Sequence, residues 1–208
     1  MSKNIATIVT GTLLGLILVI GGCFTLERPS PDKQFYMLEV KTPEPKPSVT
    51  GRVLKIQNVG VSPQYAGKAF VYVRSHGVYA SDFYNAFFVA PSAMFTELVR
   101  QWLGASGLFG HVIESSSYME ATYILESTVT ALYGDYRVGQ SPRAVVEMKF
   151  LLLENSTSAP HAILDKSYRL EISIPGTSPN ELVKGWSVAT GRILDGFAQD
   201  LSEVLNKV

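Results

Sequence analysis

Cysteine is nearly absent from this sequence, and so is any excess of charge. The 208 residues contain a single cysteine and three histidines. One thiol cannot form an internal disulfide, and neither residue type recurs at the spacing of a metal site. Lysine plus arginine equal aspartate plus glutamate, at 18 each, so no overall field attracts nucleic acid. The chain must therefore rely on an apolar core, and a hydrophobic content of 46% is enough to build one.

Patterns of catalytic residues are also missing. The three histidines are scattered along the chain: His76, His111 and His161. We interpret the first and the last as loop residues. No Gly-x-Ser-x-Gly elbow is present, and residues 104–107 are not followed by the Lys-Ser/Thr pair of a phosphate-binding loop. The carboxylates of Asp82 and Glu126 have no evident acid/base partner. We therefore expect a non-enzymatic protein without a metal.

One long apolar run is present, and it lies at the N-terminus. Residues 5–20 form it, a lysine precedes it, and Gly21, Gly22 and Cys23 end it. This order is typical of a secretory signal, with a basic start, an apolar stretch and small residues at the cleavage site. The ending resembles the lipobox of bacterial lipoproteins, in which the thiol is alkylated with diacylglycerol and the new amino terminus is acylated. We therefore expect a signal peptide at 1–22, cleavage between Gly22 and Cys23, and no cofactor other than this covalent lipid (diacylglycerol and an N-acyl chain such as palmitate).

Other interpretations of this segment stay open. Residues 5–22 number about 18, the lower edge for a membrane-spanning helix, so an uncleaved anchor is one alternative. A buried helix fits less well because the stretch has no polar face. A lone cysteine is usually a small core residue, but its position at the end of the run argues against that here. Residues 23–34 carry prolines and charges, which predicts a short lipidated tether.

Residues 35–208 are long enough for one domain and mix strand and helix patterns. Alternating or continuous apolar residues predict strands at 35–40, 52–61, 69–74, 83–89, 108–113, 121–132, 143–153 and 163–174. Helical spacing predicts one helix over 91–104, capped by Ser92, and a second over 178–204 that begins with a capping box at Ser178. This order predicts an α+β domain with a mixed, largely antiparallel sheet and two principal helices.

Several short motifs follow one another in this domain. Phe35-Tyr36-Met37-Leu38 begins it, and residues 84–91 and 103–109 surround the first predicted helix. Ala121-Thr122-Tyr123-Ile124-Leu125-Glu126 and Ala144-Val145-Val146 open two later strands. In this order the motifs resemble the ABC-type transport auxiliary lipoproteins, a family that includes the PqiC-like lipoproteins of MCE transport systems.

The resemblance covers roughly residues 35–201 and departs from the family at Phe87-Phe88, where a tryptophan is common. It implies an accessory subunit of an MCE-type ABC lipid transport system. Such a subunit docks to the periplasmic MCE protein, helps lipids move between membranes and can form a homo-oligomeric ring. The residue after Cys23 is not aspartate, which by the enterobacterial sorting rule implies the periplasmic face of the outer membrane of a Gram-negative bacterium rather than the inner membrane.

An aromatic segment at 79–88 is the expected partner interface, because it has few charges. The candidate residues are Tyr79, Phe83, Tyr84, Phe87 and Phe88. An ordinary aromatic strand is the other interpretation of this segment. The alternative function is that of a stand-alone lipid-binding or chaperone-like envelope lipoprotein with an internal apolar pocket.

Overall fold

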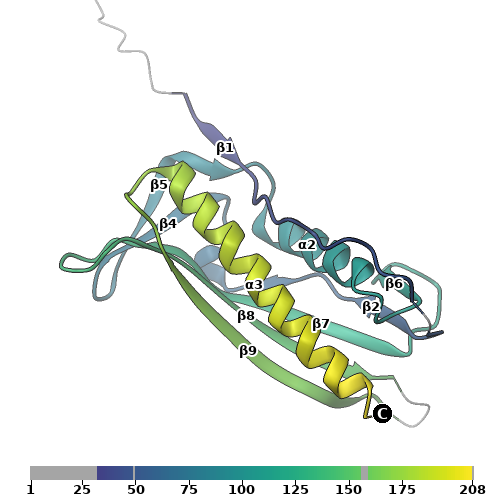
Figure 1. The fold of residues 1–208 in the computed structure, drawn as a ribbon. Helices are drawn as coiled ribbons and strands as arrows, with labels where there is room; N and C mark the ends of the chain where they lie inside the picture. Colours follow the sequence, from purple (N-terminus) through teal and green to yellow (C-terminus); the bar gives the residue numbers. More distant parts are fainter. Residues whose placement is uncertain (1–31, 49, 156–158, 208) are drawn as a thin grey trace, which may run out of the picture. The chain divides into compact units, whose positions relative to one another are not determined.

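The computed structural model describes residues 32–48, 50–155 and 159–207. The expected signal peptide at 1–22, the lipidation site Cys23 and most of the tether at 23–34 lie outside the described residues. The contacts divide the chain into Met1–Asp32 and Lys33–Val208, and the helices and strands of Figure 1 belong to the second unit. Among the described residues, no helix combines the length and the apolar character needed to cross a membrane.

The elements of the described residues confirm the predicted α+β class, with a mixed nine-stranded sheet and two principal helices. Their order is β1 (Gln34–Tyr36), β2 (Val53–Ile56), β3 (Gly60–Val61), the short 3-10 helix η1 (Pro63–Tyr65), β4 (Ala69–Ser75), β5 (Val78–Phe87), α2 (Pro91–Ala105), β6 (His111–Glu114), β7 (Tyr123–Asp135), β8 (Arg143–Glu154), β9 (His161–Ser173) and α3 (Pro179–Leu205).

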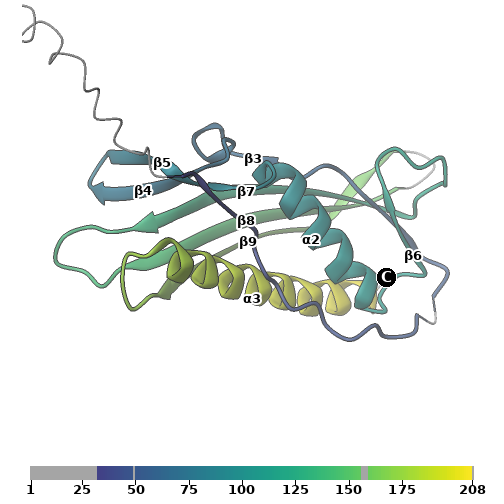
Figure 2. The ribbon, with the colours of Figure 1, turned by 90° about the horizontal axis from the view of Figure 1, so that it is seen from above.

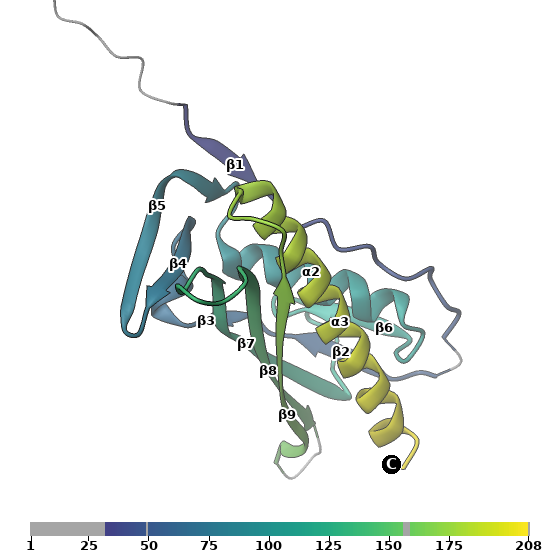
Figure 3. The ribbon, with the colours of Figure 1, turned by 60° about the vertical axis from the view of Figure 1, so that its left-hand side comes forward.

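Strand β7 is the centre of the sheet. On one side it pairs antiparallel with β8, which pairs antiparallel with β9. On the other side β2, β3 and β4 pair with successive parts of β7, all in parallel. Beyond them, β6 lies beside β2, while β5 and then β1 lie beside β4, so that β1 and the β4–β5 hairpin gather at one end of the sheet (Figure 3).

Both helices pack against the sheet and contact each other, as the view from above shows (Figure 2). The core is aromatic where α3 meets the β4–β5 hairpin, with the Trp186 ring 5.0 Å from Phe70 and 5.4 Å from Phe87. The indole Nε1–H of Trp186 donates to the carbonyl of Tyr133, at 3.1 Å, so its polar group is satisfied in the core. Gly185 lets α3 approach β8, because a Cβ there would lie 2.5 Å from the Cβ of Ala144.

The start of α3 was predicted correctly, and that of α2 was not. Ser178 caps α3 by accepting a hydrogen bond from the backbone N–H of Glu181, at 3.3 Å. The N-cap of α2 is instead Ala90. Ser92, the predicted cap, donates its hydroxyl to the carbonyl of Val59.

Two predicted strands are shorter or broken in the structure. The stretch 52–61 forms β2 and β3 rather than one strand, because α2 takes both backbone groups of Val59: Thr96 accepts from its N–H, at 2.8 Å, and Ser92 donates to its carbonyl. The predicted strand 35–40 ends at Tyr36, since the following residues leave the sheet and lie along α3.

Candidate partner interface and adjoining groove

Aromatic side chains stand exposed where β1 pairs in parallel with the end of β5. They are Phe35, Phe83, Tyr84 and Phe88, which we call the aromatic edge. Phe83 is 67% exposed and Phe88 is 63% exposed. The rings touch in pairs, with centroids 6.3 Å apart for Phe35 and Phe88 and 5.1 Å apart for Phe83 and Tyr84. Grouped exposed apolar side chains of this kind are typical of surfaces that bind a partner or a membrane.

An irregularity in β5 turns Phe83 and Tyr84 outward. Val71 of β4 pairs with Ser81 of β5, whereas Ala69 pairs with Ala86. The two-residue interval from Ala69 to Val71 on β4 therefore lies opposite the five-residue interval from Ser81 to Ala86 on β5. The extra residues of β5 form a bulge that is not part of the regular ladder.

The carboxylate of Asp82 holds this bulge together. One oxygen accepts the backbone N–H groups of Tyr84, at 2.8 Å, and of Asn85, at 3.0 Å. The other accepts the side-chain amide of Asn85, at 2.9 Å, and the phenol of Tyr72 on the neighbouring strand. The phenol of Tyr36 in turn donates to the amide oxygen of Asn85, at 3.2 Å. This network connects β1, β4 and β5 beneath the aromatic edge.

The protonation states in this network fit a structural role. Burial raises the pKa of Asp82, but the hydrogen bonds from Tyr72, Asn85 and the backbone outweigh burial and lower that pKa below its ordinary value of 3.8. Burial, and then the hydrogen bond to Asp82, raise the pKa of Tyr72. At neutral pH the pair is therefore an ionised acceptor and a protonated donor. Asp82, for which the sequence showed no acid/base partner, has Tyr72 as a hydrogen-bond partner.

The structure gathers some of the predicted interface residues and separates others. Phe83, Tyr84 and Phe88 belong to the aromatic edge. Tyr79 is exposed but lies elsewhere, with its ring 6.4 Å from that of Tyr133. Phe87 was predicted wrongly, because it is only 2% exposed and packs against Phe70 and Trp186.

Phe35 belongs to the edge and was missed. Its signal in the sequence was its position on the outward side of the first strand, opposite the buried Leu38. The remaining predicted site residues, Gly22 and Cys23, lie outside the described part of the chain.

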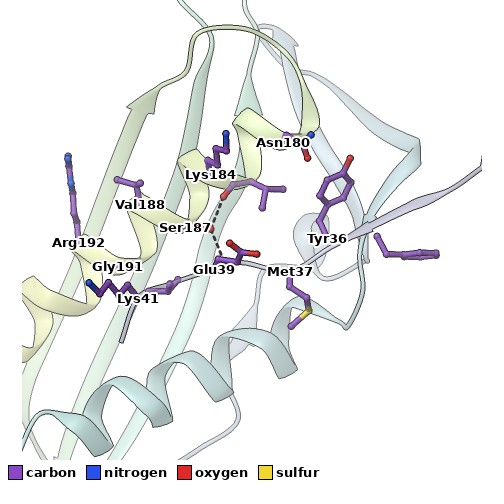
Figure 4. A pocket seen from close by; sticks show the side chains of 13 residues that line it. Tyr36, Met37, Glu39, Lys41, Asn180, Lys184, Ser187, Val188, Gly191 and Arg192 are labelled. Atoms are coloured by element: carbon purple, nitrogen blue, oxygen red, sulfur yellow. Dashed lines mark hydrogen bonds between the residues drawn. The ribbon is translucent and has the colours of Figure 1, made fainter. Parts of the chain in front are cut away.

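A groove of about 860 Å³ adjoins the aromatic edge, between residues 35–41 and one face of α3 (Figure 4). Its lining is Phe35, Tyr36, Met37, Glu39, Val40, Lys41, Asn180, Val183, Lys184, Ser187, Val188, Gly191 and Arg192. The two walls are joined at Ser187, whose hydroxyl accepts the backbone N–H of Glu39, at 3.0 Å, and donates to the carbonyl of Val183, at 2.8 Å. Phe35 belongs to both the groove and the aromatic edge.

The histidines and acidic residues do not form a metal centre in the described ranges. No group of three or more histidine, cysteine, aspartate or glutamate side chains is placed to hold a metal ion there. His76 lies in a turn, as predicted, but His161 begins β9 and pairs with Glu154, at 3.2 Å, so its prediction as a loop residue was wrong.

Solved structures of other proteins share the fold of this chain. No family model and no curated protein matches the chain. Protein XCC0632 from Xanthomonas campestris, of the DUF330 family, superimposes with a TM-score of 0.72 at 14% identity, over 84% of this chain and 97% of the other. The chain shares the fold of this protein. The crystal structure of an uncharacterized protein gives a TM-score of 0.61 at 20% identity, over 82% of this chain and 99% of the other.

A PelC dodecamer from Paraburkholderia phytofirmans also shows some similarity. Its TM-score is 0.41 at 14% identity, over 76% of this chain and 95% of the other, which is too low to carry an argument. The identities of the first two structures are so low that their likeness concerns the fold alone.

These findings correct the expected membership in the ABC-type transport auxiliary lipoproteins. No family model matches the chain, and the family named among the similar folds is DUF330. The physical reason is burial: motif residues such as Phe87, Tyr123, Leu125 and Val145 are core residues. Apolar residues at those positions are what any sheet of this shape needs, so they do not distinguish one family from another.

Proposed function

We propose that this protein is a lipid-anchored, non-enzymatic docking subunit of a cell-envelope lipid transport system. In this proposal Cys23 carries the lipid and the domain lies on the periplasmic face of the outer membrane. Its aromatic edge binds the MCE-type periplasmic protein of an ABC transporter. The observation that carries the proposal is the aromatic edge itself, because exposed aromatic side chains on a rigid support are characteristic of protein-binding surfaces.

The position of this edge supports a docking role near a membrane. Strand β1 begins eleven residues after Cys23. An extended chain spans about 3.3–3.6 Å per residue, so this tether reaches at most about 40 Å. An anchor at Cys23 would thus keep the aromatic edge close to the bilayer, where it could bind a partner protein that reaches that membrane.

The rigidity of the edge supports binding as well. The Asp82 network fixes the backbone of Tyr84 and Asn85, and Lys68 donates to the carbonyl of Phe88, at 2.9 Å. A backbone that is already ordered loses little further conformational entropy when a partner binds. A ring of several copies remains a prediction, and the mass of the isolated complex would measure it.

The test removes the aromatic edge without disturbing the core. A tagged full chain is isolated from detergent-solubilised membranes, and co-purifying proteins are quantified by mass spectrometry. We expect the wild type to recover an MCE-type protein. We expect the triple variant Phe35→Ser, Phe83→Ser, Phe88→Ser to lose recovery by about tenfold or more, since hot-spot aromatics each contribute about 2 kcal/mol.

The matched control is the double variant Tyr118→Ser, Val138→Ser, which removes exposed apolar side chains outside the aromatic edge. It should recover the partner like the wild type, and thermal denaturation should show all variants folded. Recovery of the same MCE-type protein by the triple variant, or of none by the wild type, would contradict the proposal.

A further inference from the structure

We infer that the groove between residues 35–41 and α3 binds a glycerophospholipid. Its phosphate would lie at the end formed by Lys41 and Arg192, and its acyl chains would point toward the aromatic edge. The inference rests on the proposed function and adds to it the molecule that the docking subunit itself holds.

One wall of the groove changes from apolar to charged along its length. Along residues 35–41, exposed side chains alternate with more buried ones, and Leu38 is buried in the core. The exposed side carries Phe35 and Met37 first, then Glu39 and Lys41. This wall is therefore amphiphilic, as a lipid is.

The other wall is a face of α3 that does not belong to the core. Lys184, Val188 and Arg192 follow one another at intervals of four residues and are exposed (Figure 4), while Trp186 and Ile193 on the core side are buried. Gly191 also lines this wall and lies close to the opposite one, since a Cβ added there would be in van der Waals contact with Val40, at 3.4 Å. Lys41 follows Val40 and Arg192 follows Gly191 in the sequence, and both cations line the groove.

The positive charges of Lys41 and Arg192 favour the phosphate at their end of the groove. In the described part of the chain, Lys41 and Arg192 have no acidic partner, whereas Lys184 pairs with Glu181, at 3.3 Å. Among the described residues, Glu39 is the one carboxylate that lines the groove, and it would repel a phosphate beside it. Two unpaired cations at one end of a groove attract a phosphate to that end.

The apolar end continues beyond the groove. Phe35 lines the groove and touches Phe88, so an acyl chain that leaves the groove meets the aromatic edge rather than water. The volume of about 860 Å³ is in the range of sites that hold small molecules, about 300–1,000 Å³. A lipid is favoured over an acidic protein segment because an anchor at Cys23 would keep the start of β1, which leads into the groove, within about 40 Å of a bilayer.

The test measures lipid binding by the full chain in detergent micelles, by native mass spectrometry. The probes are phosphatidylglycerol, diacylglycerol with the same acyl chains, and glycerol 3-phosphate. We expect phosphatidylglycerol to bind more tightly than either of the other two. The double variant Lys41→Gln, Arg192→Gln should weaken it by about tenfold or more, the effect of losing charge-assisted hydrogen bonds, and should leave diacylglycerol unchanged.

The matched control Lys149→Gln, Lys207→Gln removes two exposed cations outside the groove and should bind phosphatidylglycerol like the wild type. Equal affinity of the groove variant and the wild type would overturn the inference. Glycerol 3-phosphate binding as tightly as the lipid would overturn it too, because the site would then be one for free phosphate esters.

The outcome is separable from that of the proposed function. If the wild type binds no lipid but still recovers an MCE-type protein, this inference fails alone. If it binds lipid through Lys41 and Arg192 but recovers no such protein, the docking proposal fails alone.

Discussion

The outer face of β8 and β9 and the aromatic edge are both exposed, but they differ in how their side chains are partnered. On the outer face Arg169 pairs with Glu147, at 2.8 Å, and with Glu171, at 3.0 Å. Lys149 pairs with Asp165 on the next strand, at 3.3 Å. Charged residues of both signs alternate there with buried ones, so this face of the sheet is well solvated.

At the aromatic edge, by contrast, no ion pair is formed by the described side chains. Phe35, Phe83 and Phe88 are held on an ordered backbone and remain exposed, with Lys33 placed over the ring of Phe83, at 4.7 Å from its centroid. A cation over a ring does not cover the rest of an apolar surface. The charged side chains of the large outer face thus have partners within the sheet, whereas the aromatic side chains of the small irregular edge remain exposed.

The strongest test of this comparison uses two adjacent residues of the same type. Phe87→Ala removes a buried ring from the core around Trp186, and we expect the free energy of unfolding to fall by about 3–5 kcal/mol. Phe88→Ala removes an exposed ring, and we expect a change within about 0.5 kcal/mol. Urea denaturation measures both. Similar losses for the two variants would show that Phe88 is part of the core. Phe88 would then not belong to an exposed aromatic edge.

A smaller effect is expected from the support beneath the edge. Asp82→Asn removes the charge that accepts hydrogen bonds from Tyr72 and Asn85, which should lower the free energy of unfolding by about 1–3 kcal/mol at pH 7. Because the pKa of Asp82 is lowered in the folded state, its stabilisation is present above its unfolded pKa and is lost as the pH falls through its folded pKa.

The difference between wild type and Asp82→Asn should therefore shrink as the pH is lowered below about 4. Urea denaturation across this range measures it, with Glu126→Gln, an exposed carboxylate on β7, as the control. A difference that stays constant with pH would mean that the carboxylate is not ionised in the network.

Much of the fold could be predicted because its signals are local. The alternation in β8 and β9 and the capping box at Ser178 depend on neighbouring residues only, and both were confirmed. The division of 52–61 into β2 and β3 depends on Val59 bonding to α2, more than thirty residues away. That one edge of β7 receives three parallel strands is likewise non-local, and no pattern within those strands indicates it.

The exposed residues of the candidate site could be predicted only in part, because they too depend on more than a local pattern. Along β5, Tyr79, Ser81 and Phe83 are exposed at every second position, and regular alternation would expose Phe87 as well. The bulge inserts an odd number of residues and reverses the alternation, so Phe87 turns into the core. Asp82 followed by Asn85 is a local signal of this bulge, because an aspartate side chain accepts backbone N–H groups two and three residues further on.

The smallest expected effect lies on the outer face. Lys149 and Asp165 are both about half exposed, at 50% and 54%, so their ion pair is screened by water. A double-mutant cycle with Lys149→Ala and Asp165→Ala should give a coupling free energy below about 0.5 kcal/mol, falling further with added salt. A coupling above about 1 kcal/mol would mean that the ion pairs of this face stabilise the fold and that the face is not merely a solvated surface. The outer face and the aromatic edge would then differ only in which kinds of side chain they expose.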